Sequence, residues 1–268
     1  VRDRIRRSKL MPRVQRFSDG RFQSMDIAVV QERPLSLYVN GQELVTLLCT
    51  PSKLEALVVG FLSFEGIIRG LEDIQSLTVL DGDGYADVRL TSDFVPPRRR
   101  IHTSGCGGGI TFSLETHGSA ALQDDSTVDP RSLFPLIREL SVEAQAYRES
   151  RGIHAAALAE GEKLLIVAED VGRHNALDKV CGEALLRGIS AAGKILLATG
   201  RISSEMLRKA AHMGTALVIS RTSATTLSIE LAKRLGLTLI GYVRGDSFTV
   251  YSHPERLVIP RPVPALAR

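Results

Sequence analysis

The sequence predicts a protein of mixed α/β architecture, in which a smaller α+β region precedes a larger layered α/β region. From residue 153 onward, apolar strand patterns alternate with helical patterns, which is typical of a layered α/β domain. Before residue 128, short alternating strands surround a single strong helical pattern. The chain has 268 residues, 44% of them hydrophobic, which is enough to bury a sizeable core in each region. We expect a basic tail over 1–25, an α+β region over 26–128 and an α/β domain over 129–268.

The N-terminal tail carries most of the positive charge of the chain. Residues 1–21 contain eight Lys or Arg and two Asp, a net charge of +6, whereas the whole chain carries +4. The remainder is therefore mildly acidic at −2, which is unfavourable for general nucleic-acid binding. We expect the tail to be solvated, with an RNA-binding arm as the alternative interpretation.

The α+β region is predicted from hairpins around one helix. Asn40-Gly41 is a typical two-residue hairpin turn, and Asp81–Gly84 joins a second strand pair. Ser52 and Glu55 have the spacing of a capping box at a helix start, and Gly66 follows the last helical residue. The acidic turn lacks the further ligands of an EF-hand, which excludes that type of calcium site. Strands are expected over 27–30, 35–39, 44–49, 77–80, 86–90 and 110–114.

The C-terminal domain is predicted to have a largely parallel or mixed sheet. Asp129-Pro130 marks a helix start, and Pro135 is expected to disturb the early part of that helix. Helices are expected over 129–149, 172–187, 203–213 and 225–235. Strands are expected over 153–158, 163–168, 194–198, 216–220, 237–243 and 248–251.

The three cysteines do not form a disulfide or zinc framework, because their number is odd, their spacing is wide and no C-x-x-C pair exists. Cys49 lies in an apolar strand pattern and Cys181 on the apolar face of a helix, so both should be buried. Cys106 instead lies between Gly105 and three further glycines, in a loop whose amides can stabilise an anion. The loop is therefore a candidate for thiol chemistry; the alternative is a flexible hinge with an incidental cysteine.

Polar loops follow three predicted strands, over 169–175, 199–204 and 221–226. Each opens a helix, and helix N-termini favour anions such as phosphate. Arg201 and Ser223 belong to two of these loops. Arg173 and His174 begin the first helix away from its apolar face, so we expect them to be exposed and to serve function rather than folding; a capped helix with surface charges is the alternative. His154 suits a core position and a site equally well.

These motifs together resemble the formate dehydrogenase accessory sulfurtransferases, the FdhD family. The most specific is the run from Glu169 to Lys179, Glu-Asp-Val-Gly-Arg-His-Asn-Ala-Leu-Asp-Lys. The resemblance extends over about residues 29–257 and includes the segments 63–68, 105–107, 154–156, 200–209, 223–232 and 251–256.

The resemblance implies a sulfur carrier that accepts persulfide sulfur from a cysteine desulfurase. It implies transfer of that sulfur to the bis-molybdopterin guanine dinucleotide cofactor, before the cofactor enters formate dehydrogenase. The implied reactive residue is Cys106, and the implied C-terminal fold is a three-layer domain similar to cytidine deaminases. The expected cofactor-binding residues are Tyr242, Val243, Arg244, Gly245, Asp246, Ser247, Arg173, His174, Arg201 and Ser223.

One position departs from the family pattern. Many members carry C-x-x-C in the cysteine loop, and here the second position is Gly109, so a relay between two cysteines is not expected. A zinc deaminase needs H-x-E and P-C-x-x-C, but Ala156 replaces the glutamate and no cysteine pair exists. The remaining alternative is a non-catalytic chaperone that only binds the guanine-nucleotide-bearing cofactor.

The expected setting is cytoplasmic, with a homodimer as the expected assembly. No apolar run reaches the length that spans a bilayer, and the basic N-terminus lacks the apolar core of a secretory signal. We expect no resident metal, no zinc, no nucleic-acid partner and no membrane partner.

Overall fold

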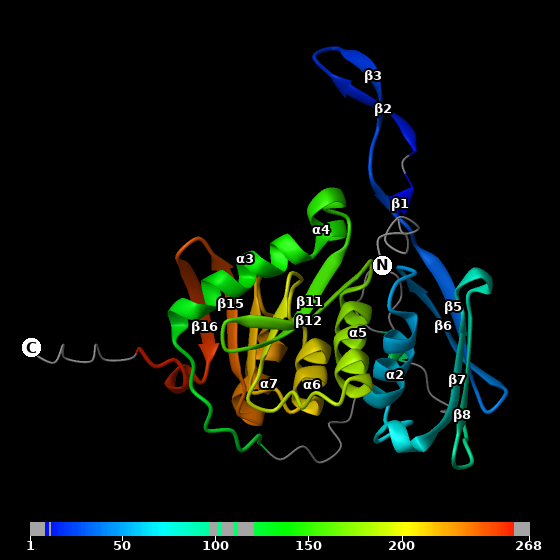
Figure 1. Ribbon diagram of the computed structural model, residues 1–268. Helices are drawn as coiled ribbons and strands as arrows, with labels where there is room; N and C mark the ends of the chain where they lie inside the picture. The colour runs from blue at the N-terminus through cyan, green and yellow to red at the C-terminus, as the bar shows by residue number, and fades with distance from the viewer. Residues whose placement is uncertain (1–8, 11, 97–100, 103–109, 112–120, 260–268) are drawn as a thin grey trace, which may run out of the picture. The chain divides into compact units, whose positions relative to one another are not determined.

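The computed structural model describes residues 9–10, 12–96, 101–102, 110–111 and 121–259 (Figure 1). The chain divides into two compact units that are interleaved along the sequence. The first unit comprises 1–117, 141–157 and 166–190, and the second comprises 118–140, 158–165 and 191–268. The architecture is mixed α/β, with several sheets and helices, as predicted. The three predicted domain ranges stay a prediction.

A four-stranded sheet forms the centre of the first unit. It contains β5 (Arg33–Val39), β6 (Gln42–Cys49), β7 (Ile74–Leu80) and β8 (Tyr85–Leu90), in the order β6-β5-β8-β7. β5 runs antiparallel to β6 and parallel to β8, and β7 is antiparallel to β8. Asn40 and Gly41 both have positive φ, at 48° and 81°, which confirms the predicted hairpin turn.

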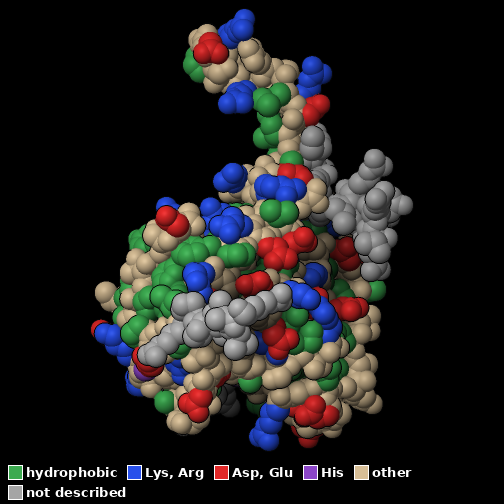
Figure 2. All heavy atoms as spheres, turned by 60° about the vertical axis from the view of Figure 1, so that its left-hand side comes forward, with side chains coloured by type: hydrophobic (Ala, Val, Ile, Leu, Met, Phe, Trp, Pro, Cys, Tyr) green, Lys and Arg blue, Asp and Glu red, His purple; other side chains and the backbone are tan. Residues whose placement is uncertain are grey.

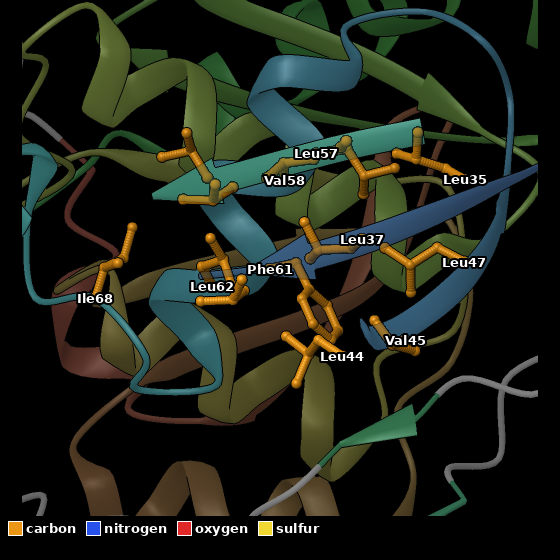
Figure 3. Packing of buried hydrophobic residues seen from close by; sticks show 14 of the residues in the cluster. Leu35, Leu37, Leu44, Val45, Leu47, Leu57, Val58, Phe61, Leu62 and Ile68 are labelled. Atoms are coloured by element: carbon orange, nitrogen blue, oxygen red, sulfur yellow. The ribbon is translucent and has the colours of Figure 1, made fainter. Parts of the chain in front are cut away.

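Helix α2 (Leu54–Phe64) packs on this sheet and closes its hydrophobic core. Figure 3 shows Leu57, Phe61 and Leu62 of the helix meeting Leu37 and Leu44 of the sheet, all of them at most 2% exposed. Cys49 is also buried at 1%, as its strand pattern predicted.

The predicted capping box at the start of α2 is wrong. The N-cap is Lys53, in the left-handed region at φ 51°, and it makes no side-chain cap. Its Nζ instead donates to the carbonyl oxygen of Val167 at 2.7 Å and pairs with Glu183. The N-cap is therefore one residue after the predicted Ser52, and the Lys53 side chain bonds to Val167 and Glu183 instead of to the helix end.

Helices α2 and α5 (Arg173–Leu186) touch through two glycines. A Cβ atom on Gly60 would lie 1.9 Å from the carbonyl oxygen of Asp178, and one on Gly182 would lie 1.9 Å from that of Ala56. Real Cβ atoms do not approach backbone oxygens so closely, so the two backbones are in direct contact. The glycines make this approach possible because they lack a Cβ.

Part of the basic tail forms a hairpin, a structure that the sequence analysis did not predict, and most of its residues are exposed, as expected for a solvated tail. β2 (Arg13–Ser18) and β3 (Arg21–Asp26) pair antiparallel through the turn at Asp19 and Gly20, which have φ of 51° and 72° (Figures 1 and 2). Asp-Gly is a strong hairpin signal, and it went unrecognised between strands that have little apolar character. We call residues 13–26 the arm hairpin.

Short elements complete the first unit. β1 (Lys9–Leu10) pairs antiparallel with β4 (Val29–Val30), and β9 (Ile101–His102) pairs antiparallel with β10 (Ile110–Thr111). The others are two 3-10 turns, η1 (Leu71–Asp73) and η2 (Asp81–Asp83), and helix α4 (Gln145–Ser150).

The second unit contains the predicted mixed sheet. β13 (Ile195–Ala198), β14 (Leu217–Ser220) and β15 (Thr238–Arg244) run parallel, and β16 (Ser247–Ser252) is antiparallel to β15. Helices α6 (Ser204–His212) and α7 (Thr226–Leu235) follow β13 and β14 and begin at the caps Ser203 and Thr225. Strands β11 (His154–Glu160) and β12 (Lys163–Asp170) have residues in both units. The likeness to cytidine deaminases stays an expectation.

The helical segment predicted over 129–149 is divided at a different place from the one expected. Asp129 caps a 3-10 turn, η3 (Pro130–Ser132), by accepting the N–H of Arg131 at 2.9 Å. Helix α3 (Leu133–Glu143) then runs through Pro135 and ends before Ala144. Pro135 does not disturb the helix because it lies in the first turn, where the N–H that proline lacks has no intrahelical partner.

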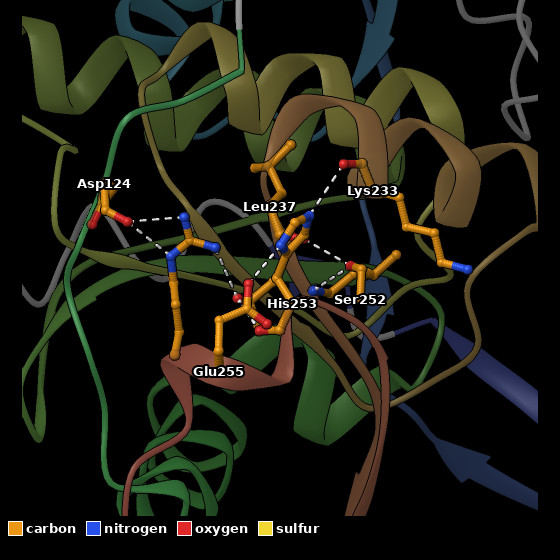
Figure 4. A network of polar contacts seen from close by, with 9 residues as sticks. Asp124, Lys233, Leu237, Ser252, His253 and Glu255 are labelled. Atoms are coloured by element: carbon orange, nitrogen blue, oxygen red, sulfur yellow. Dashed lines mark hydrogen bonds and ion pairs between the residues drawn. The ribbon is translucent and has the colours of Figure 1, made fainter.

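The segment Tyr251–Arg256, which the family resemblance included, ties the C-terminal end of the second unit together (Figure 4). Ser252 Oγ donates to the carbonyl oxygen of Leu237 at 2.7 Å, and the His253 ring contacts Glu255 and the Lys233 carbonyl. The Arg256 guanidinium, through Nη2, donates to the carbonyl oxygen of Asp124 at 2.9 Å, and the η4 turn (Pro254–Arg256) presents it. This motif therefore stabilises the fold.

Replacing Gly60 or Gly182 by alanine should lower the free energy of unfolding by about 2–3 kcal/mol, because the added methyl group must push the helices apart. Urea denaturation of each variant measures the change. The control is Gly82→Ala, since a Cβ atom on Gly82 would meet no other atom within 4 Å and the backbone there has no positive φ. Unchanged midpoints for both helix variants would contradict the direct backbone contact.

Candidate functional site

Two polar loops of the second unit are joined by hydrogen bonds at the carboxyl ends of β13 and β14. Ser220 Oγ donates to the carbonyl oxygen of Gly200 at 2.7 Å. The N–H of Ile202 donates to the Ser223 carbonyl oxygen at 3.0 Å, and that of Thr225 donates to the Ile202 carbonyl oxygen at 3.1 Å. Loops 199–203 and 221–225 are therefore joined in one layer at the carboxyl ends of the two strands.

The turn between β15 and β16 joins the same layer. The N–H of Tyr242 donates to the carbonyl oxygen of Thr222 at 3.0 Å, and Arg244 Nε donates to that of Arg221 at 3.0 Å. A Cβ on Gly241 would lie 2.7 Å from the Thr222 oxygen, so glycine is needed where the strand passes the loop. We call the segments 199–203, 221–225 and 242–247 the strand-end loops.

The strand-end loops contain eight of the ten predicted cofactor-binding residues. Arg201, Tyr242 and Arg244 are exposed, and the Arg244 guanidinium lies 5.7 Å from the centre of the Tyr242 ring. Gly245, Asp246 and Ser247 are exposed, and Ser223 is half-buried. Val243 differs from the others, because its side chain is 1% exposed and belongs to the core. Only its backbone could meet a ligand.

The chemistry of the strand-end loops suits an anionic ligand. Arg201 and Arg244 supply permanent positive charge, and the N-termini of α6 and α7 lie in the same layer, where helix ends favour phosphate. The exposed Tyr242 ring adds an aromatic face, and Asp246 adds a carboxylate that can accept hydrogen bonds. This combination fits a phosphorylated nucleoside better than a free metal ion or an apolar ligand.

The long motif over 169–179 begins with a buried ion pair in the first unit. Asp170, at the end of β12, pairs with Lys179 of α5 at 2.6 Å, and both side chains are fully buried. Lys179 Nζ also donates to the carbonyl oxygens of Thr50 at 2.9 Å and Glu169 at 3.1 Å. Each buried charge therefore has an oppositely charged partner and hydrogen bonds, and a charged side chain can be buried only when it has such partners.

The same carboxylate organises the surrounding backbone. Asp170 accepts the N–H of Thr50 at 3.0 Å, the N–H of Gly172 at 2.9 Å and the side-chain amide of Asn175 at 3.0 Å. The amide of Asn175 also donates to the Leu48 carbonyl oxygen at 2.8 Å. Much of the motif is therefore a clamp that fixes the end of β6 to the start of α5.

The sequence reasoning missed this clamp. Asp170 and Lys179 are nine residues apart and belong to different elements, so no helical or strand period relates them. The available signal was a lysine within the predicted apolar stretch of the helix, between Leu177 and Val180. A charged residue at such a position needs a buried partner, and a search for that partner leads to Asp170.

Arg173 and His174 are buried, which corrects the prediction that they are exposed. Each side chain is 6% exposed, although both begin α5 away from the apolar face. The reason is that α5 is buried on more than one side, since its buried residues include Asp178 and Lys179 as well as the apolar ones. The two residues belong to the first unit and not to the strand-end loops, and their role in binding stays a prediction.

His154 lies at the start of β11, as predicted, in the neighbourhood of Arg173 and Asp170. Its pKa is lowered below the ordinary 6.5, first by burial and second by the positive charge of Arg173, with Asp170 opposing the shift. The ring is therefore neutral at pH 7 and able to accept a proton through one nitrogen.

The two described cysteines are both buried. Burial raises the pKa of Cys49 to about 12, with the negative charge of Asp170 as the second cause. Cys181 is 4% exposed, as its helical position predicted. Cys106 and its glycines lie outside the described residues. Within the described part of the chain, no group of three His, Cys, Asp or Glu residues could hold a metal ion.

The helices of the described residues include none that is long and apolar enough to cross a membrane.

Known proteins similar to this chain share both its sequence and its fold. Residues 30–258 match the FdhD/NarQ family. A protein of Bacillus subtilis named sulfur carrier protein FdhD is 40% identical over 250 residues, covering 91% of this chain and 95% of that protein. A protein of the same name from Staphylococcus aureus is 37% identical over 249 residues, covering 91% and 94%. A crystal structure from Desulfotalea psychrophila, described as a formate dehydrogenase accessory protein, matches with a TM-score of 0.78 at 30% identity, covering 93% and 99%.

His154 should make the protein less stable in mild acid. Because the pKa in the folded state lies below 6.5, the unfolded chain binds the proton more readily. The contribution of the neutral His154 ring to the unfolding free energy is fully present above about pH 6.5, and it is lost as the pH falls toward the pKa of the folded state. His154→Asn should therefore reduce the decrease in unfolding free energy between about pH 7 and pH 5.

Urea denaturation at a series of pH values measures this slope, with Lys163→Gln as an exposed control that should keep the wild-type slope. A His154→Asn slope equal to that of the wild type would show that the histidine titrates alike in both states.

Proposed function

Because the chain belongs to the FdhD/NarQ family, we propose that it is a sulfur carrier in the maturation of formate dehydrogenase. The observation that carries this proposal is the match over residues 30–258, together with relatives of that name that align along nearly their whole length. A match of this extent includes both compact units, so the shared function applies to the chain as a whole and not to one grafted segment.

Cys106 is the proposed sulfur acceptor. Its thiolate attacks the terminal sulfur of a cysteine desulfurase persulfide, so that the new S–S bond forms on Cys106 and the desulfurase cysteine leaves as a thiolate. Cys49 and Cys181 are buried, and the raised pKa of Cys49 keeps that thiol protonated. In the sequence Cys106 is flanked by Gly105 and Gly107, which have no side chains that could obstruct an approaching partner.

The proposed substrate that receives the sulfur is the bis-molybdopterin guanine dinucleotide cofactor. The strand-end loops would bind its guanine nucleotide end. The guanidinium groups of Arg201 and Arg244 and the starts of α6 and α7 would hold the phosphates, and Asp246 would accept hydrogen bonds from the base. Support for this assignment comes from the shared layer of three loops and from their exposed positive charges.

The same proposal defines the setting of the protein. It acts in the cytoplasm as a sulfurtransferase, between a cysteine desulfurase and formate dehydrogenase, and we propose a homodimer as its assembly. The alternative function is a chaperone that binds the guanine-bearing cofactor without carrying sulfur. The strand-end loops would serve either function, so the requirement for Cys106 distinguishes the two.

Cys106→Ala should abolish sulfur transfer, because the two described thiols, Cys49 and Cys181, are buried. Incubation with a cysteine desulfurase and cysteine should add one sulfur atom to the wild-type chain at Cys106, as detected by mass spectrometry of its peptides. Cys181→Ala is the matched control and should still acquire the sulfur. Formate dehydrogenase activity in cells that lack their own carrier provides the second readout. Full activity with Cys106→Ala would contradict the sulfur-carrier function and leave the cofactor chaperone as the remaining function.

GDP should bind to the strand-end loops more tightly than AMP, as measured by calorimetry. Arg244→Ala and Arg201→Ala should each weaken GDP binding about tenfold, which corresponds to about 1.4 kcal/mol. Arg234→Ala removes an exposed arginine from the last turn of α7 and should bind GDP normally. Equal affinity for GDP and AMP, or no effect of either loop substitution, would contradict the assignment of the site.

A further inference from the structure

The arm hairpin lies before residue 30, where the match to the family model begins, and none of the proposed site residues belongs to it. Its two strands pair in full register, from Arg13 opposite Asp26 to Ser18 opposite Arg21. Within the described residues, its sheet contains these two strands alone. A two-stranded hairpin is only marginally stable in water, and both of its outer edges can accept another strand.

One face of the arm hairpin is apolar near the turn. Phe17 and Phe22 lie directly opposite each other, with ring centres 5.1 Å apart and ring planes tilted by 55°. Their exposed fractions are 62% and 72%, although burying an aromatic ring is strongly favourable. Figure 2 shows hydrophobic side chains reaching the surface on this hairpin. An exposed aromatic pair of this kind indicates an interaction surface.

The opposite face of the arm hairpin is basic near the turn. Strand residues alternate between faces, so Arg16 and Arg21 share the face away from the two phenylalanines. Both arginines are exposed. The turn end of the hairpin therefore presents aromatic rings on one side and two guanidinium groups on the other.

We propose that the arm hairpin binds an extended segment of a partner protein in which apolar and acidic residues alternate. A strand added to either open edge also alternates its side chains between the two faces. Its apolar residues would pack beside Phe17 and Phe22, while its carboxylates would lie beside Arg16 and Arg21. One extended segment would thus meet both faces and complete the backbone hydrogen bonding of the edge.

Charge and geometry favour such a partner segment over a second copy of the arm or a single-stranded nucleic acid. Arg16 and Arg21 place two positive charges on one face near the turn, so a second arm added in the same orientation would bring like charges together on that face. A single-stranded nucleic acid would have to stack on the rings and neutralise the arginines from the same side, but these groups lie on opposite faces. An alternating strand meets both requirements.

The test uses the full chain and a fluorescein-labelled peptide of four Val-Glu repeats, with binding followed by fluorescence anisotropy. The peptide should bind the wild type, and added salt should weaken the binding because the contact is partly electrostatic. Two peptide controls should not bind: a Val-Lys repeat of the same length, and a Val-Glu repeat methylated on alternate backbone nitrogens, which cannot pair along a strand edge. Binding of either control as tightly as the first peptide would overturn the proposal.

Matched variants locate the contact. The double variants Phe17→Thr with Phe22→Thr, and Arg16→Glu with Arg21→Glu, should each weaken peptide binding at least about tenfold. Leu227→Gln removes an exposed apolar side chain of the second unit and should leave the affinity unchanged. Melting curves should match that of the wild type, since the replaced residues are exposed.

Three results would refute the proposed occupant. The first is the absence of peptide binding, and the second is binding of an oligothymidylate that the same double variants weaken. The third is a change in the sedimentation of the free chain when Phe17 and Phe22 are replaced, which would identify a second copy as the occupant.

Discussion

The buried pairing of Asp170 with Lys179 is the interaction on which the organisation of the first unit depends. Neither side chain reaches water, so each charge needs the other and the surrounding backbone groups. Thr50 satisfies this need from both sides, because its N–H donates to Asp170 and its carbonyl oxygen accepts from Lys179. The end of β6, the end of β12 and the start of α5 are thereby held in one arrangement, and replacing either ion would leave the other buried without compensation.

The close approach of α2 and α5 complements this pairing. The glycine contacts at Gly60 and Gly182 place the helix backbones against each other, and the buried residues of α5 include polar as well as apolar ones. A helix enclosed in this way can carry Arg173 and His174 as buried groups. Polar residues of the long family motif therefore contribute to folding, and any part they take in binding is built on that structural role.

Much of the fold follows from local patterns in the sequence. The hairpin turn at Asn40-Gly41, the strand and helix order after residue 153 and the burial of Cys49 and Cys181 were all predictable, because each depends on turn chemistry or on a hydrophobic period. The capping box at Ser52 and the break at Pro135 were wrong, because the choice of cap and the place where a helix ends depend on what neighbouring elements offer. The arm hairpin was missed because its strands bury almost nothing.

The sequence by itself determined the types of element, the three polar loops at strand ends and the single cysteine outside the apolar patterns. The tertiary structure decided which of these residues share a place. It brings Arg201, Ser223 and Arg244 into one layer, because parallel strands end at the same edge of a sheet. It assigns Arg173 and His174 to a buried helix start in the first unit. The hydrophobic period of a sequence describes one helix or strand at a time. Which residues are buried, and which distant residues pair, is decided only when these elements pack against one another.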